Sequence, residues 1–131
     1  MILDTSFLID LLRGSDNKAK EKAEKLDHEF RVKGTTTITV MELWRGAMKS
    51  LHTEEEKKKV NELLKALLIY PLREKDAKKA GEIEAKLIKN GEMVDLEDIM
   101  ISGICLARNE TILTKNTKHF NRIEGLNVES Y

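Results

Sequence analysis

The chain begins MILDTSFLIDLLRG (residues 1–14), in which a short apolar run is broken at its fourth position by an aspartate. The first three residues predict a buried strand. The apolar spacing of the following TSFLIDLLR, ended by Gly14, predicts a helix with a glycine stop. Asp4 therefore lies where a strand meets a helix. Burial of an unpaired carboxylate there has a large desolvation cost, so Asp4 requires a partner.

Segments of strand and helix character alternate along the rest of the chain. The strand segments cover residues 34–40 (GTTTITV), 68–72 (LIYPL), 111–116 (TILTKN) and 127–131 (NVESY). Helical spacing covers residues 15–33, 39–51, 74–91 and 96–109, and a further segment from residue 52 onward. This alternation predicts an α/β fold: a three-layer α/β/α sandwich with a central, mostly parallel sheet, in one domain over residues 1–131.

Local signals predict where these helices start and what they bury. Two helix starts have the spacing of a capping box, which pairs Thr39 with Glu42 and Thr53 with Glu56. The helix expected over residues 15–33 has a thin apolar stripe made by Ala19, Ala23, Leu26 and Phe30. Cys105 is the single cysteine, which excludes an internal disulfide and favours a buried free thiol.

Composition limits the function classes. The chain has 23 basic and 23 acidic residues, so its net charge of zero creates no overall field toward nucleic acid or an anionic membrane. A polyanion would have to be bound by a local patch. No apolar run approaches the roughly 20 residues of a membrane span, and we expect a soluble, cytoplasmic protein.

Four polar residues follow or precede the predicted strands at corresponding places. Asp4 ends the first strand, Glu42 lies in the first turn of the helix after the second, Asp98 lies near the start of the helix before the fourth, and Asn116 follows the fourth. In parallel α/β folds the carboxyl ends of the strands share one edge, where ligands bind. Oxygen donors of this kind suit Mg²⁺ or Mn²⁺, which activate water and polarise phosphoryl groups for phosphodiester hydrolysis.

Each of these residues also has a structural explanation, and the residues alone leave both open. Asp4 is a good helix N-cap, and Glu42 is the acidic member of the capping box with Thr39. Asp98 stands where a helix N-terminus favours negative charge, and Asn116 is a residue typical of turns after strands.

Four motifs in order along the chain resemble those of the PIN domain family and, within it, of the VapC-type toxins of toxin–antitoxin operons. They are LDTSFLIDLL (3–12), ITVMELWRG (38–46), GEMVDLEDIMISGICLA (91–107) and ILTKNTKHFNRI (112–123). The resemblance covers nearly the whole chain. It implies a Mg²⁺- or Mn²⁺-dependent endoribonuclease with a PIN-like fold that acts as a homodimer on RNA and pairs with a cognate antitoxin protein.

The resemblance also assigns roles to residues. It implies that the metal is held by Asp4, Glu42 and Asp98, with hydroxyls of Thr5 and Ser6 beside the first acid. The acids at positions 95 and 97 are near enough to contact the ligands or to replace one of them. The fourth catalytic position is Asn116, where relatives often have Asp, so one negative charge is absent from the metal site.

Two other functions compete with this one. A catalytically weak or inactive PIN-fold binding module is favoured by Asn116 and opposed by the three retained acids, and a metal titration separates the two. A phosphoaspartate enzyme with Asp4 as nucleophile lacks its usual second acid, because position 6 is Ser. No glycine-rich phosphate loop for dinucleotides or nucleotides is present.

The remaining polar residues near the motifs have two interpretations. Five basic residues are either solvated or contact RNA phosphate: Arg45, Lys49, Lys115, Lys118 and Arg122. The three histidines, at 28, 52 and 119, lack the spacing of metal ligands and are expected to be ordinary surface residues, and of the three only His119 is near the proposed site.

Overall fold

A single five-stranded sheet organises the computed structural model, which describes residues 1–131. The strand order is β3-β2-β1-β4-β5, and every pair of neighbours is parallel. The strands are β1 (Ile2–Leu3), β2 (Gly34–Thr36), β3 (Leu68–Tyr70), β4 (Ile112–Leu113) and β5 (Val128–Glu129). The chain thus enters the sheet at its centre and extends it first to one side and then to the other. This confirms the predicted parallel α/β architecture.

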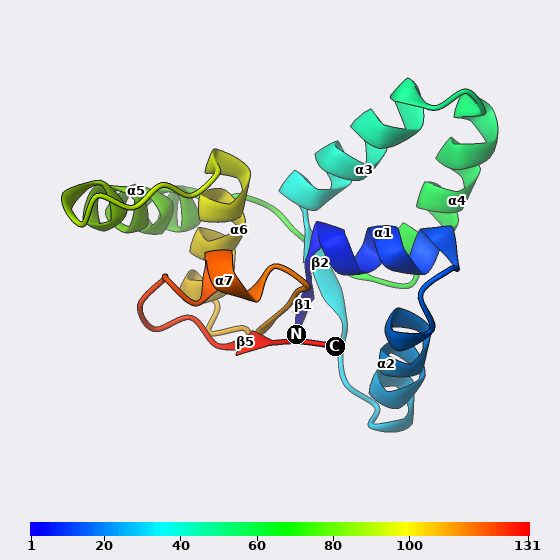
Figure 1. Ribbon diagram of the computed structural model, residues 1–131, viewed down its shortest axis with the longest axis horizontal. Coiled ribbons are helices and arrows are strands. Elements are labelled where there is room, and N and C mark those ends of the chain that lie inside the picture. Colours follow the sequence, from blue (N-terminus) through cyan, green and yellow to red (C-terminus); the bar gives the residue numbers. More distant parts are fainter.

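Seven helices flank the sheet (Figure 1). They are α1 (Thr5–Arg13), α2 (Asn17–His28), α3 (Thr37–Lys49), α4 (Thr53–Lys65), α5 (Glu74–Lys89), α6 (Leu96–Ala107) and α7 (Thr117–Phe120). Figure 1 shows α5, α6 and α7 on one side of the sheet and α1, α2 and α4 on the other. None of the helices combines the length and hydropathy that crossing a membrane requires.

Each face of the sheet has its own apolar core. Eleven buried residues, among them Ile101, Ile104 and Phe120, join the sheet to α5, α6 and α7. Ten others, among them Phe7, Leu8 and Leu43, join it to α1, α2, α3 and α4. The sheet therefore lies between two layers of helices, with one apolar core on each of its faces.

The second strand is shorter than its β-branched sequence predicts. It ends at Thr36, and α3 begins at once with Thr37, so residues 37–40 are helical. The cause is local: Thr36 is the N-cap of α3, and its hydroxyl accepts a hydrogen bond from the backbone N–H of Thr39 at 3.1 Å. The prediction of a capping box between Thr39 and Glu42 is therefore wrong, and Glu42 lies in the second turn of α3 rather than the first.

Two other local predictions are wrong. The N-cap of α4 is His52, and the Thr53 hydroxyl donates back to the carbonyl of Ser50 at 2.9 Å, so Thr53 and Glu56 form no capping box. The α2 helix ends at His28, and Phe30 adopts a left-handed backbone with φ 52° and is 93% exposed. Phe30 consequently takes no part in the apolar stripe. The stop at Gly14 and the buried thiol at 105 are confirmed.

Candidate functional site

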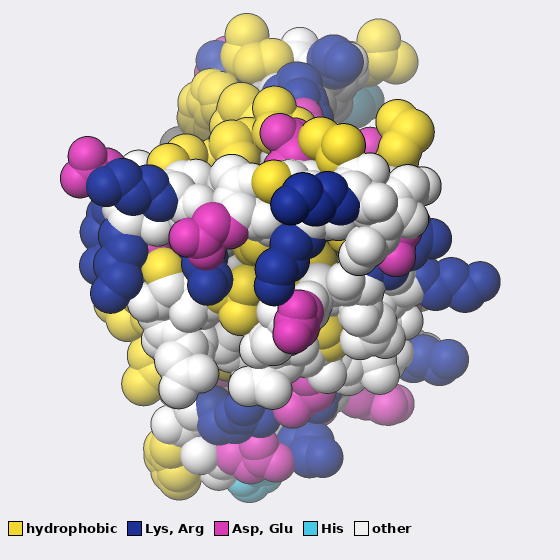
Figure 2. Space-filling model, turned by 90° about the vertical axis from the view of Figure 1, so that its left-hand side faces the viewer, with side chains coloured by type: hydrophobic (Ala, Val, Ile, Leu, Met, Phe, Trp, Pro, Cys, Tyr) yellow, Lys and Arg dark blue, Asp and Glu magenta, His cyan; other side chains and the backbone are white.

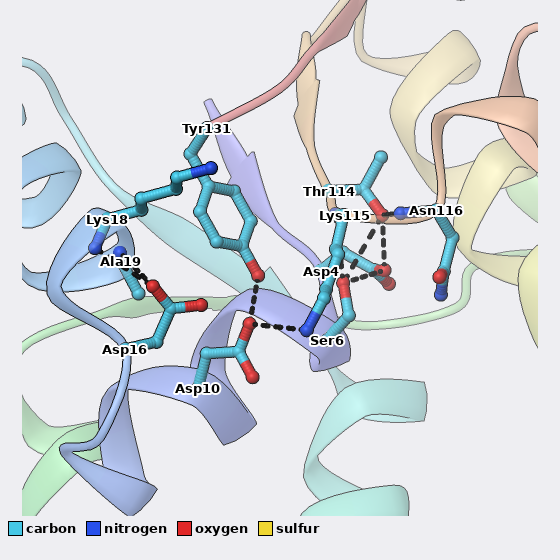
Figure 3. Close-up of polar contacts among 10 residues, drawn as sticks. All are labelled: Asp4, Ser6, Asp10, Asp16, Lys18, Ala19, Thr114, Lys115, Asn116 and Tyr131. Carbon is cyan, nitrogen blue, oxygen red and sulfur yellow. Dashed lines mark hydrogen bonds and ion pairs between the residues drawn. The ribbon is translucent and has the colours of Figure 1, made fainter.

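The carboxyl ends of β1 and β4 lie side by side, because these strands are paired in register. Asp4 follows β1 and is only 3% exposed. Its Oδ2 accepts hydrogen bonds from the hydroxyl of Thr114 at 2.7 Å and from that of Ser6 at 3.0 Å (Figure 3). Asp4 occupies the N-cap position of α1, but its side chain makes no capping hydrogen bond. Its partners within the chain are thus two hydroxyls, and burial still raises the pKa of Asp4 above its usual range.

Glu42 reaches this edge of the sheet from the second turn of α3. Its Oε1 accepts a hydrogen bond from the hydroxyl of Thr5 at 2.7 Å, which ties α3 to the first turn of α1. Burial raises the pKa of Glu42, and the negative charges of Asp4 and Glu97 raise it further. The Arg45 guanidinium lies between two of these acids, 4.0 Å from Glu42 and 3.9 Å from Glu97.

Asp98 reaches the site from the first turn of α6. Burial, followed by the negative charge of Asp4, raises the pKa of Asp98 to about 6. Asp95, the N-cap residue of α6, adds a smaller repulsion. The carboxylate of Asp98 lies 3.4 Å from Nδ1 of His119, so this histidine contacts the site rather than belonging to the ordinary surface.

Asn116 lies beside the acids through its backbone. Its N–H donates to the Thr114 hydroxyl at 3.0 Å, and that hydroxyl in turn donates to Asp4. The side-chain amide of Asn116 makes no hydrogen bond within the chain, although the residue is the N-cap of α7. The Thr114 hydroxyl, rather than the asparagine amide, therefore shapes the turn after β4.

Two contributors were not identified as partners of the acids from the sequence. Thr114 was visible only as a strand end, and its role as donor to Asp4 depends on the pairing of β1 with β4, which joins residues 110 positions apart. His119 reaches Asp98 only because the four-residue helix α7 turns the chain back toward α6. Its sole sequence signal was its place within the fourth motif, ILTKNTKHFNRI (112–123).

The donor set fits a hard divalent cation. Asp4, Glu42 and Asp98 each have a pKa raised chiefly by burial, and the charge of Asp4 raises the pKa of both others, so the three share one electrostatic site. They supply only carboxylate oxygens, the ligands preferred by Mg²⁺ and Mn²⁺. As arranged here, no three His, Cys, Asp or Glu side chains form a group that could hold an ion. Mutual repulsion of carboxylates opposes their closer approach.

Comparisons with known proteins place the whole chain in one family. The family model described as PIN domain matches residues 1–126. A curated relative, the tRNA(fMet)-specific endonuclease VapC of Salmonella typhimurium, is 30% identical over 130 residues, which cover 99% of this chain and 96% of the relative. Ribonuclease VapC2 of Haemophilus influenzae is 26% identical with the same coverage.

Solved structures of toxin–antitoxin complexes have the same fold. VapBC2 from Rickettsia felis, bound to a DNA fragment from its promoter, superposes with a TM-score of 0.91 at 25% identity, covering 99% of this chain and 97% of that one. DNA-bound VapBC from Salmonella typhimurium gives a TM-score of 0.89 at 29% identity, with 98% and 96% covered. The similarity therefore spans the complete sandwich.

Proposed function

The chain belongs to the PIN domain family, and from this premise we propose that it is a metal-dependent endoribonuclease, the toxin of a type II toxin–antitoxin pair. The observation that carries the proposal is the placement of three acids near one another at the carboxyl edge of the sheet: Asp4 before α1, Glu42 in the second turn of α3 and Asp98 in the first turn of α6. A buried carboxylate and two partly buried ones that it repels are costly for a fold. A divalent cation bound by these carboxylates would offset their repulsion, which gives a reason for their placement.

The three acids would hold Mg²⁺ or Mn²⁺. When bound, such an ion polarises a phosphoryl oxygen and makes its bound water a better nucleophile. The chain itself fixes the ligand oxygens: Thr114 and Ser6 bind the same oxygen of Asp4, which leaves its other oxygen available, and Thr5 binds one oxygen of Glu42 in the same way.

Asn116 completes the site that we propose. Its side-chain amide is not engaged within the chain and can donate to a substrate phosphate oxygen or accept from water. Asn116 cannot contribute the negative charge that an aspartate would, so the charge available for metal binding comes from the other three residues.

The substrate that we propose is RNA. The Salmonella relative is named for its specificity toward tRNA(fMet), which makes initiator tRNA the first substrate to test. The chain carries no net charge, so attraction of RNA to the acidic edge depends on individual cations near it. We assign the reaction to the cytoplasm.

Two protein partners fit the surface. The solved relatives are toxin–antitoxin complexes, and we assign the antitoxin to a groove between α1, α3 and α4. This groove is lined by apolar residues such as Ile9 and Leu12 and by the charged residues Arg13, Glu56 and Lys59. Figure 2 shows hydrophobic side chains gathered at the end of the molecule where Figure 1 places α3 and α4. Met48 is 54% exposed and Leu51 97% exposed there, and we assign this end to a homodimer contact.

The test is cleavage of an initiator tRNA transcript by the purified protein with Mg²⁺ or Mn²⁺. Asp4→Asn should abolish cleavage while the protein stays folded, because it removes a ligand charge and keeps the shape. Glu84→Gln, on the exposed face of α5, is the matched control and should cleave normally. Normal cleavage by Asp4→Asn would refute the assignment.

A PIN-fold binding module is the second candidate, and Asn116 at the fourth position is the observation that favours it. It predicts RNA binding with no cleavage across a titration of both metals. The endoribonuclease predicts cleavage that rises with metal concentration and saturates.

A further inference from the structure

Lys115 is held at two points beside the acidic site. Its backbone N–H donates to the Ser6 hydroxyl at 3.1 Å, and Ser6 donates in turn to Asp4. Its ammonium group donates to Oδ2 of Asp10 at 3.3 Å. Figure 3 shows the lysine side chain extending from the turn after β4 to the carboxylate of Asp10 on α1. The direction of this side chain is thus set by two contacts with one helix.

Asp10 is itself held in place. It is 8% exposed, and its Oδ2 accepts a hydrogen bond from the Tyr131 hydroxyl at 2.6 Å (Figure 3). The Tyr131 ring packs edge-on against Phe7, with ring centroids 4.8 Å apart. The hydrogen bond from Tyr131 and the charge of Lys115 lower the pKa of Asp10, so this carboxylate is ionised at neutral pH.

Stability alone is a poor explanation for this arrangement. The Lys115 side chain is 60% exposed, and ion pairs with an exposed partner contribute only about 0–1 kcal/mol. Keeping a carboxylate nearly buried at position 10 has a desolvation cost that an apolar residue would avoid. The ammonium uses one of its three N–H donors on Asp10 and has no other side-chain or backbone acceptor in the chain. What the contacts achieve is a fixed, solvent-facing cation with free donors.

We propose that Lys115 binds a backbone phosphate of the RNA substrate next to the one that is cleaved, and that Asp10 and Tyr131 are positioning residues for its ammonium group. This inference rests on the proposed ribonuclease function. The cleaved phosphate belongs at the acids, whereas Asp10 is six residues along α1 from Asp4, about 9 Å at the helical rise. The lysine therefore serves a neighbouring phosphate on the α1 side of the site.

Electrostatics support this role. Three carboxylates repel a polyanion, and the chain has no excess of basic residues that would attract one from a distance. Of the five basic residues near the motifs, Arg45 lies between Glu42 and Glu97, which neutralise much of its charge locally. Lys115 pairs with a single carboxylate and keeps most of its ammonium in water. It is therefore a cation at the rim of the site that remains available to offset this repulsion.

Two measurements on an initiator tRNA transcript test the inference. The first is the KM and kcat of cleavage with Mn²⁺. The second is the Kd for RNA binding to the metal-free protein in EDTA, across roughly 50 to 200 mM salt, where loss of one phosphate contact lowers the slope of log K against log salt by about 0.7–0.9.

Lys115→Met should raise KM and Kd about five- to tenfold, leave kcat within about twofold, and lower the salt slope as stated. Lys115→Arg should restore the wild-type values. Asp10→Asn and Tyr131→Phe keep the lysine charge but free its side chain, so each should raise KM about two- to threefold with the salt slope unchanged. Lys65→Met is the matched control, because Lys65 is also ion-paired, with Glu62 at 2.9 Å, but lies at the end of α4 before β3, away from the carboxyl edge.

Unchanged KM, Kd and salt slope in Lys115→Met would overturn the inference. Tighter RNA binding by Asp10→Asn would overturn the positioning role, because Asp10 would then compete with the phosphate. The proposed function fails separately: it is refuted when Asp4→Asn cleaves like the wild type, whatever the lysine variants do. Melting temperatures of all variants establish that each is folded.

Discussion

Asp98→Asn should stabilise the metal-free protein at neutral pH even though it removes a proposed metal ligand. Burial and the nearby charge of Asp4 raise the pKa of Asp98 to about 6, from 3.8 for an unperturbed Asp. The ionised side chain is thus disfavoured in the folded state. Asparagine has nearly the same shape and no charge, so it removes this penalty.

The sign and size follow from proton linkage. Because the pKa is higher in the folded chain than in the unfolded chain, the folded state binds more protons between pH 3.8 and about 6, and wild-type stability falls as pH rises through this window. Two pKa units correspond to roughly 2–3 kcal/mol at 1.36 kcal/mol per unit. For a chain of 131 residues, about 2 kcal/mol shifts the melting temperature by roughly 8 °C.

The assay is urea unfolding of the wild type and Asp98→Asn in EDTA at about pH 3.5, 5, 6 and 8. The difference in unfolding free energy should be near zero at the lowest pH and grow to its full value by about pH 7. Glu84→Gln, on the exposed face of α5, should follow the wild type at every pH. Adding Mn²⁺ should stabilise the wild type more than the variant, since ligand binding to the folded state raises stability by mass action.

A stability difference that does not change with pH would refute the reasoning, because it would mean that the charge of Asp98 has no cost in the folded state. A variant less stable than the wild type at pH 8 would show that the contact of the Asp98 carboxylate with His119 outweighs burial.

Three further changes test the site and the scaffold. Glu42→Gln should lower the metal-dependent rate at least roughly tenfold, about 1.4 kcal/mol, without lowering the metal-free melting temperature; a normal rate would make Glu42 structural. Asp76→Ala should destabilise by about 3–5 kcal/mol in denaturant titration, because it leaves the nearly buried guanidinium of Arg108 without its carboxylate; a loss below about 1 kcal/mol would contradict this. Gly103→Ala should lower the free energy of unfolding by about 1–3 kcal/mol, since the added Cβ would lie 2.6 Å from a backbone oxygen of α5. Gly81→Ala is the control and should cause no loss of stability, because its Cβ would meet nothing within 4 Å.

The architecture was predictable because its signals are local and repeated. Strand and helix character alternate, and the glycine stop at Gly14 has the left-handed φ of 65° that the pattern requires. The order of strands in the sheet was not predictable in this way. It depends on which apolar faces pack together across more than a hundred residues, and the pairing of Asp4 with Thr114 depends on that order.

The errors have a common physical origin, which is tertiary context acting against local preference. Residues 37–40 are largely β-branched and favour a strand, yet they are helical because the Thr36 hydroxyl caps α3 and the following residues bury Thr39 and Leu43 against the core. Phe30 fits the apolar spacing of α2 but comes after the helix has ended. In both places the spacing of apolar residues along the sequence did not show where the helix begins or ends.

Asp4 and Asn116 do lie just after β1 and β4, as their sequence positions predicted, but Glu42 lies in the second turn of α3 rather than the first. The immediate hydrogen-bond partners of these side chains were not predicted. Reasoning from desolvation alone assigns Asp4 a compensating cation, but within the chain it has two hydroxyls and a raised pKa. Hydroxyls satisfy the hydrogen-bonding capacity of a buried carboxylate without neutralising its charge. The negative charge of Asp4 therefore remains uncompensated after folding, and α3 and α6 bring Glu42 and Asp98 to the same edge, where their charges repel that of Asp4. The divalent ion that we propose would supply the charge that no lysine or arginine of this chain provides to Asp4.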